Sequence, residues 1–108
     1  MVKQGDIIKI NFNPQAGHEQ ADYRPVIVVS NDFFNKKTNL TIVCPVTNTI
    51  SDFPLHVKLD ERTTTTGAIL CEHLKALDIN KRTYKIIEPL PKDILEQVID
   101  IIFAEIEN

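Results

Sequence analysis

Hydrophobic and polar residues alternate, or β-branched residues cluster, along several short stretches of the chain. Alternation with a period of two places one set of side chains on each face of a β-strand, and β-branched residues favour strands. Turn-forming residues separate the stretches at close spacing, which is typical of a compact barrel or a tightly curled sheet. The predicted strands cover residues 5–12, 26–30, 40–47, 55–59, 68–77 and 84–88.

The connections between the predicted strands carry their own local signals. Residues 33–40, FFNKKTNL, are interpreted as a turn, because their asparagines tolerate left-handed backbone geometry. Residues 80–82, NKR, are interpreted as a turn or a short helical piece, and the threonines at 63–66 as a solvated loop. Pro45 lies inside a predicted strand and has no N–H group, so we expect a bulge or a sheet edge there.

The last stretch of the chain has a different period. From Pro91 onward, hydrophobic residues recur at spacings of three and four, and acidic and amide residues occupy the opposite face. This pattern predicts an amphipathic helix with Pro91 in its first turn, where a missing N–H costs no hydrogen bond. The apolar stripe consists of Leu95, Val98, Ile99, Ile102 and Ile106.

Length and composition indicate one globular domain covering residues 1–108. The chain has 108 residues, of which 43% are hydrophobic and 25% charged, which is enough for a single hydrophobic core. No apolar run approaches the roughly 20 residues that span a bilayer, and the first residues lack the apolar segment of a secretory signal. We therefore expect a cytoplasmic protein without a membrane contact.

Charge and cysteine content limit the kinds of ligand and site that the chain can have. The net charge is −3, but the acidic excess is concentrated in residues 90–108, so the rest of the chain can present a locally basic groove. Cys44 and Cys71 lie in apolar runs, and we expect two buried thiols. Neither a disulfide framework nor the spacing of a zinc site is present.

One loop concentrates reactive groups ahead of an apolar strand. The segment GHEQADYRPVIVVS, residues 17–30, contains His18, Glu19, Gln20 and Arg24. An imidazole titrates near neutral pH, and a guanidinium can donate two parallel hydrogen bonds to a phosphate. The alternative interpretation is structural, with an ion pair between Arg24 and Glu19 that shapes the loop and a solvated His18.

A second group of polar residues stands at the ends of predicted strands. A hydroxyl and an amide after one strand can hold a phosphate or a ribose 2′-hydroxyl, or can simply form a turn. The charged residues after a later strand form either a sheet edge that discourages aggregation or the second wall of a cleft. These candidates are Thr47, Asn48, Thr49, Glu72, His73 and Lys75. Without a glycine-rich phosphate loop or a metal-ligand cluster, the set suits phosphodiester chemistry that needs neither metal nor cofactor.

Six segments resemble, in order and in spacing, the MazF/PemK family of toxins. The resemblance covers nearly the whole chain, and its specificity lies in the combination of the opening loop with the strand that ends in threonine. The segments are GDI at 5–7, PxxGHEQ at 14–20, RPVIVVSN at 24–31, CPVT at 44–47, TGAILCEHLKALD at 66–78 and the terminal helix.

The resemblance implies a mainly β fold with α, a curled antiparallel sheet with an SH3-like barrel core and a C-terminal helix, assembled as a homodimer. It also implies sequence-specific, metal-independent cleavage of single-stranded RNA, in which the 2′-hydroxyl attacks to leave 2′,3′-cyclic phosphate and 5′-hydroxyl ends. A MazE-like antitoxin would inhibit the toxin, and operator DNA would be bound only by the toxin–antitoxin complex. The family's catalytic positions fall on Arg24 and Thr47, with Glu19 and His18 in support; Gln20, Asn48, Thr49, Glu72, His73 and Lys75 are expected to contact RNA.

Two positions of this chain depart from the family pattern. Many relatives have glycine where this chain has Asp22, and one branch has an Arg–Asp acid–base pair where this chain has Leu70 and Glu72. We therefore favour Arg24 with Thr47 as the catalytic pair.

Two other functions are alternatives to RNA cleavage. A gyrase-poisoning toxin of the CcdB kind would not need this set of side chains. A barrel that only binds single strands usually has more aromatic stacking platforms than this chain provides.

Overall fold

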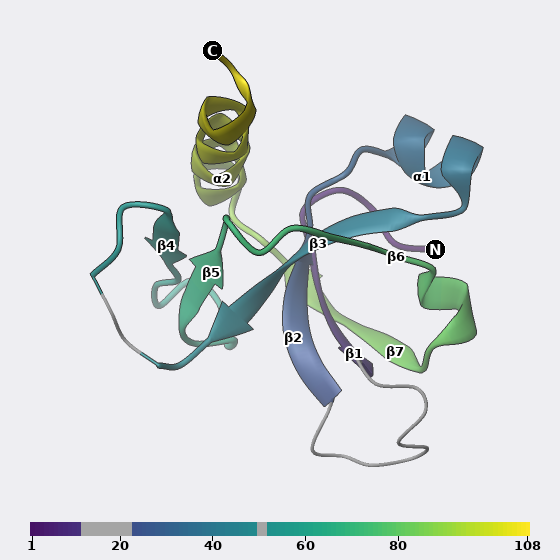
Figure 1. Cartoon of the computed structure of the whole chain (residues 1–108). Coiled ribbons are helices and arrows are strands. Elements are labelled where there is room, and N and C mark those ends of the chain that lie inside the picture. Colours follow the sequence, from purple (N-terminus) through teal and green to yellow (C-terminus); the bar gives the residue numbers. More distant parts are fainter. Residues whose placement is uncertain (12–22, 50–51) are drawn as a thin grey trace.

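The computed structural model describes residues 1–11, 23–49 and 52–108. Within these ranges seven strands form one antiparallel sheet in the order β4-β5-β3-β2-β1-β7, and β6 also pairs with β3. The strands are β1 (Asp6–Asn11), β2 (Tyr23–Val28), β3 (Thr41–Thr47), β4 (His56–Lys58), β5 (Ala68–Leu70), β6 (Lys75–Leu77) and β7 (Tyr84–Pro89). The helices are α1 (Asp32–Thr38), the short 3-10 helix η3 (Ile79–Lys81) and α2 (Lys92–Ile106). The predicted curled antiparallel sheet with a C-terminal helix is confirmed (Figure 1).

Strand β3 connects the two parts of the sheet because it changes partner along its length. One edge pairs with β2, while the other edge pairs first with β6 and then with β5. Pro45 lies between these two partners, where a residue without an N–H leaves no ladder hydrogen bond unmade. Figure 1 shows β3 running from α1 toward β5 across β2.

The prediction of one strand over residues 68–77 is wrong. The structure has two short strands, β5 and β6, separated by a looped-out segment that contains Glu72 and His73. The loop arises because β5 pairs with the end of β3 and β6 with its beginning, in registers that do not continue one another. A local pattern of apolar residues cannot reveal a change of partner on a distant strand.

Hydrophobic residues form two cores, one on each face of the sheet. The first core packs β2, β3 and β5 against α2, and the second packs β1, β2 and β3 against β6 and η3. Ile7 and Ile8 are both fully buried but belong to different cores, as alternation along a strand requires. Cys44 and Cys71 are buried thiols in the first core, and burial raises the pKa of Cys71 to about 12.

Helix α2 covers the first core through a face slightly different from the predicted stripe. Val98 and Ile102 are buried as expected, but Ile94 is buried as well, and Ile106 is 72% exposed. Pro91 precedes the helix at its N-cap instead of lying in the first turn. The buried face therefore begins one residue earlier than predicted and ends before the last turn. No helix in the described ranges has the length and apolar character needed to cross a bilayer.

The interpretation of residues 33–40 as a turn is also wrong, because α1 forms there. The side chain of Asn31 caps the helix by accepting a hydrogen bond of 2.8 Å from the Phe34 N–H. Asn39 ends it in the left-handed conformation, with φ of 58°, so the expected backbone geometry occurs at the helix terminus. The helix has seven residues and buries none of them, which explains the missing periodic signal.

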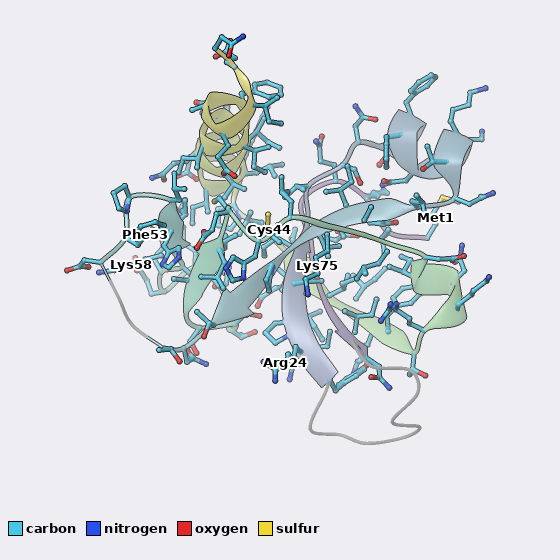
Figure 2. The ribbon with its side chains drawn as sticks, in the orientation of Figure 1. Met1, Arg24, Cys44, Phe53, Lys58 and Lys75 are labelled. Atoms are coloured by element: carbon cyan, nitrogen blue, oxygen red, sulfur yellow. The ribbon has the colours of Figure 1, made fainter. Side chains whose placement is uncertain are left out.

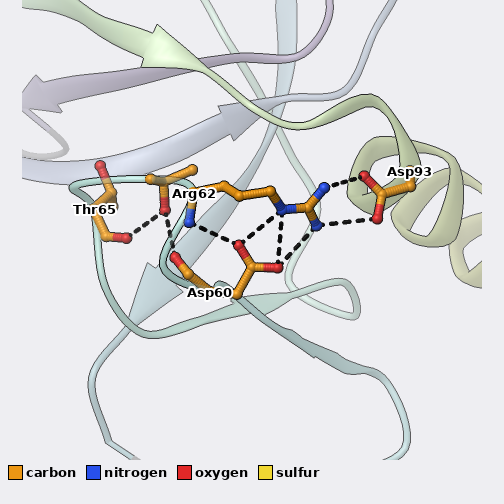
Figure 3. Close-up of polar contacts among 5 residues, drawn as sticks. Asp60, Arg62, Thr65 and Asp93 are labelled. Atoms are coloured by element: carbon orange, nitrogen blue, oxygen red, sulfur yellow. Dashed lines mark hydrogen bonds and ion pairs between the residues drawn. The ribbon is translucent and has the colours of Figure 1, made fainter.

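The threonine run is held by a carboxylate and is not simply solvated. Glu88 on β7 accepts four hydrogen bonds of 2.8–3.0 Å from the backbone and hydroxyl groups of Thr64 and Thr65. Nearby, Arg62 forms ion pairs of 2.8 Å with both Asp60 and Asp93 (Figure 3), which ties this connection to the start of α2. The segment between β4 and β5 is therefore fixed from two sides.

The Glu88 contacts predict how stability depends on pH. Partial burial raises the pKa of Glu88, but the hydrogen bonds from Thr65 and Thr64 outweigh it and lower the pKa from 4.5 to about 2. The contribution to stability is present above the unfolded pKa and is lost as the pH falls from about 4.5 toward about 2. Glu88→Gln should lower the free energy of unfolding by roughly 1–3 kcal/mol at neutral pH, with a difference that shrinks in this acid range.

Urea denaturation at a series of pH values measures this difference. The exposed Glu96 on α2 provides the control, since Glu96→Gln removes a carboxylate without removing these hydrogen bonds. A difference between wild type and Glu88→Gln that stays constant into the acid range would contradict the assignment.

Candidate active site

Arg24 on β2 and Thr47 on β3 lie at the same end of the sheet. The ladder between β2 and β3 ends at the pair Val26 and Pro45, and Arg24 and Thr47 each lie two residues beyond this pair on their own strand. Side chains two residues apart on a strand share a face, so Arg24 and Thr47 point to the face of that pair. Arg24 is exposed at the end of β2 (Figure 2). The strand pairing therefore brings a guanidinium and a hydroxyl to the same end of β2 and β3, on the same face.

The hydroxyl of Thr47 is held by the turn that follows it. Its oxygen accepts a hydrogen bond of 3.1 Å from the Thr49 N–H, which leaves the hydroxyl hydrogen to be donated elsewhere. Next to it, the carbonyl oxygen of the Asn48 side chain accepts a hydrogen bond of 3.0 Å from the Thr66 hydroxyl. The amide NH₂ of Asn48 then supplies further donors. The turn presents hydrogen-bond donors rather than acceptors, which suits an anionic ligand.

Gly67 allows β5 to approach this turn closely. Its φ is +118°, and a Cβ added there would lie 2.3 Å from the Thr47 carbonyl oxygen. No L-residue with a side chain fits such a distance without moving the backbone of Thr47. Gly67 therefore sets the position of the catalytic candidate from the neighbouring strand.

A cavity of about 320 Å³ opens beside Thr47. Its walls are the turn at residues 47–49 and the start of β5 at residues 66–68, and Lys58 of β4 contributes to its lining. Lys75 pairs with Val43 on β3 and is exposed, and by alternation it shares the face of Thr47. Of these two lysines only Lys58 lines the cavity itself, where its ammonium group favours an anionic ligand.

Glu72 and His73 form a separate cluster and do not wall the Thr47 cavity. Glu72 accepts a hydrogen bond of 2.8 Å from Nε2 of His56, and Nε2 of His73 lies 3.7 Å from the same carboxylate oxygen. Glu105 of α2 is close enough to interact electrostatically with Glu72. Partial burial raises the pKa of Glu72, but the hydrogen bond with His56 and the other contacts outweigh it and lower the pKa overall. The sequence left open whether Glu72 and His73 form a charged sheet edge or the second wall of a cleft, and neither residue lines the Thr47 cavity.

Three candidates from the opening loop remain. His18, Glu19 and Gln20 lie outside the described residues. Within the described part of the chain, no three His, Cys, Asp or Glu side chains converge as a metal site would require.

Four residues near the candidate site were not expected from the sequence: His56, Lys58, Thr66 and Gly67. The histidine and the lysine occupied the polar positions of a predicted strand, where solvent exposure explains them equally well. A glycine after a run of threonines and directly before a strand does signal special backbone geometry.

Comparison with known proteins places this geometry in one family. A family model described as PemK-like, MazF-like toxin of type II toxin–antitoxin system matches residues 3–103. Endoribonuclease PemK of Escherichia coli is 34% identical over 102 residues, covering 91% of this chain and 77% of that protein. Endoribonuclease EndoA of Bacillus subtilis is 33% identical over 91 residues, covering 80% of this chain and 78% of that protein.

Solved structures of MazF proteins are similar to this chain in fold. MazF from Deinococcus radiodurans superposes with a TM-score of 0.82 at 33% identity, covering 96% of this chain and 94% of that chain. A MazE–MazF complex from the same organism contains a chain that matches with a TM-score of 0.82 at 26% identity, covering 96% of this chain and 93% of that chain.

The close approach of Gly67 to Thr47 predicts a difference between two glycine substitutions. Gly5 and Gly67 both have positive φ, but a Cβ at Gly5 would meet only the end of the Leu95 side chain, at 3.1 Å. Gly5→Ala should therefore cost roughly 1–2 kcal/mol from backbone strain, and Gly67→Ala should cost at least 1 kcal/mol more from overpacking. Only Gly67→Ala should also shift the backbone amide NMR signals of residues 47–49. Equal costs, with those signals unmoved, would show that β5 does not position Thr47.

Proposed function

Since this chain belongs to the PemK-like, MazF-like toxins of type II toxin–antitoxin systems, we propose that it is an endoribonuclease that cleaves single-stranded RNA within a short specific sequence. Relatives that are 31–34% identical are named endoribonucleases. The observation that carries the proposal is that the pairing of β2 with β3 brings Arg24 and Thr47 to the same end of the sheet, where Thr47 lines a cavity together with Asn48 and Lys58.

The proposed reaction is a transesterification within the RNA. The ribose 2′-oxygen attacks the adjacent phosphorus, the bond from phosphorus to the 5′-oxygen breaks, and the products carry a 2′,3′-cyclic phosphate and a 5′-hydroxyl. Negative charge develops on the equatorial oxygens of the phosphorane. Arg24 can donate two hydrogen bonds to these oxygens, and the Thr47 hydroxyl can donate one more. Donors fixed before the reaction stabilise this charge without reorganisation.

Proton transfer requires groups other than Arg24. A guanidinium stays protonated in proteins, so we assign Arg24 to charge stabilisation and not to general acid catalysis. The sequence offers Glu19 or His18 as the base that accepts the 2′-hydroxyl proton. One proton is delivered to the 5′-oxygen as its bond to phosphorus breaks, so the reaction neither gains nor loses a proton overall. Because the attacking and leaving groups are both oxygens of the RNA, the proposed reaction consumes no water and needs no metal ion.

We also propose that the toxin acts as a homodimer. Phe103 and Ile106 of α2 are 60% and 72% exposed. They line an apolar groove of about 290 Å³ together with Phe34 and Leu74. A second copy of the chain would remove this surface from water.

The proposed inhibitor is an antitoxin of the MazE kind, since a related MazF has been solved with MazE. An acidic, disordered antitoxin tail would lie over Arg24 and compete with RNA for the positive potential there. Only the complex of toxin and antitoxin would bind operator DNA. The protein would act in the cytoplasm, where its RNA substrate is present.

Incubation of the purified protein with RNA in excess EDTA, followed by analysis of the new ends, tests the proposed reaction. Cleavage should persist and leave 2′,3′-cyclic phosphate and 5′-hydroxyl ends. A single 2′-deoxy substitution at the cut site should abolish cleavage while RNA binding remains. Strict dependence on added Mg²⁺, or cleavage of the deoxy substrate, would contradict the mechanism. RNA left intact under all conditions would favour a protein-binding toxin of the CcdB kind instead.

A further inference from the structure

A second hollow borders β4 and adjoins the Thr47 cavity at Lys58. Its volume is about 560 Å³, and Phe53, His56, Lys58 and Gln97 contribute to its lining. Lys58 also lines the Thr47 cavity, so one cationic side chain borders both hollows. Figure 2 shows Phe53 and Lys58 together beside β4, on the far side of the sheet from α1. An RNA strand that occupied the Thr47 cavity could continue past Lys58 into the second hollow.

The aromatic wall of this hollow is exposed but firmly supported. Phe53 is 47% exposed, although an aromatic ring is more stable when it is buried. Its ring meets the imidazole of His56 edge to face, with 5.0 Å between the ring centroids. The imidazole is fixed in turn by the hydrogen bond of 2.8 Å to Glu72. An exposed ring on a rigid support is a suitable platform for stacking a nucleobase.

The remaining groups around the hollow match the polar parts of a nucleotide. Gln97 reaches it from α2 with an exposed amide that can donate and accept hydrogen bonds at a base edge. Lys58 forms an ion pair of 3.2 Å with Asp52, in which the side chains are 66% and 90% exposed. Exposed ion pairs of this kind contribute little to stability, so a phosphate can replace Asp52 as the partner of Lys58.

We propose that this hollow is a subsite for one nucleotide that flanks the cleaved phosphodiester. The base stacks on Phe53, Gln97 contacts its edge, and Lys58 binds the phosphate that joins this nucleotide to the one in the Thr47 cavity. The inference rests on the proposed ribonuclease function and adds a specificity determinant to it. It also gives the cluster of His56 and Glu72 a role, since the pair supports the stacking platform without touching the reacting atoms.

Abasic scanning combined with a Phe53 variant tests the subsite. The substrate is the shortest oligonucleotide that the wild-type protein cuts, together with versions that lack one base at each flanking position in turn. Wild type should lose roughly 5- to 100-fold in single-turnover kcat/KM when one particular base is removed. Phe53→Ala should lose a similar factor on the intact RNA and almost nothing further when that same base is absent.

Phe33→Ala serves as the matched control. Phe33 is another strongly exposed aromatic residue, 71% exposed on α1 with the Lys37 ammonium over its ring, and it lines neither hollow. This variant should reproduce the wild-type response to every abasic substrate. Thermal midpoints of both variants should stay close to that of wild type, because neither ring belongs to a core.

The outcomes separate the subsite from the reaction. If wild type cuts RNA but the losses from Phe53→Ala and from each missing base simply multiply, the subsite is wrong and the ribonuclease proposal stands. If wild type cuts no RNA, the ribonuclease proposal fails, and the same comparison is made by fluorescence anisotropy with short oligouridine and its abasic versions. Weaker binding by Phe53→Ala, with no further loss on the abasic strand, would support a base-stacking site. Equal binding by wild type and Phe53→Ala would overturn it.

Discussion

The antiparallel register between β2 and β3 is the constraint on which the candidate site depends. With Val26 opposite Pro45, Arg24 and Thr47 arrive at the same edge and on the same face. A shift of one residue would turn one strand's side chains to the opposite face. Because Ile27 and Cys44 are fully buried on one face and Val26 and Val43 on the other, any such shift would exchange side chains between the two cores and disrupt the close packing of both. The two cores thereby fix the geometry of a polar pair that neither core contains.

Several further contacts hold the surroundings of that pair. Gly67 brings β5 against Thr47, while Glu88 and Arg62 secure the connection that leads into β5. The same strand pairing that positions β5 leaves Glu72 in a looped-out segment, where it meets His56 instead of the Thr47 cavity. The site is thus an edge feature whose precision comes from strands on both sides of β3, and the neighbouring hollow at Phe53 shares this framework through Lys58.

Features that repeat along the chain could be predicted from the sequence, and features set by distant partners could not. Alternation located most strands, and the apolar stripe located the C-terminal helix. The pattern failed at α1, which buries no side chain, and at residues 68–77, where a non-local change of partner divides the strand. Arg24 and Thr47 were recognised by their chemistry and by family resemblance, but only strand pairing brings them together. His56 gave no signal because its partner, Glu72, is distant in sequence. The catalytic roles of Arg24 and Thr47 stay predictions, as do the roles assigned to the other candidate residues.

A double-mutant cycle between Arg24 and Thr47 tests the central claim, that these two residues act on one phosphate. Single-turnover cleavage would be measured for Arg24→Ala, for Thr47→Val and for the double variant, with thermal midpoints to confirm folding. If both side chains stabilise the same phosphorane, Arg24→Ala should lower the rate by roughly 10²–10³. The double variant should then be less impaired than the product of the single effects, with a coupling of roughly 0.5–3 kcal/mol. Effects that simply multiply, in folded variants, would show that the two residues act independently and would contradict the account.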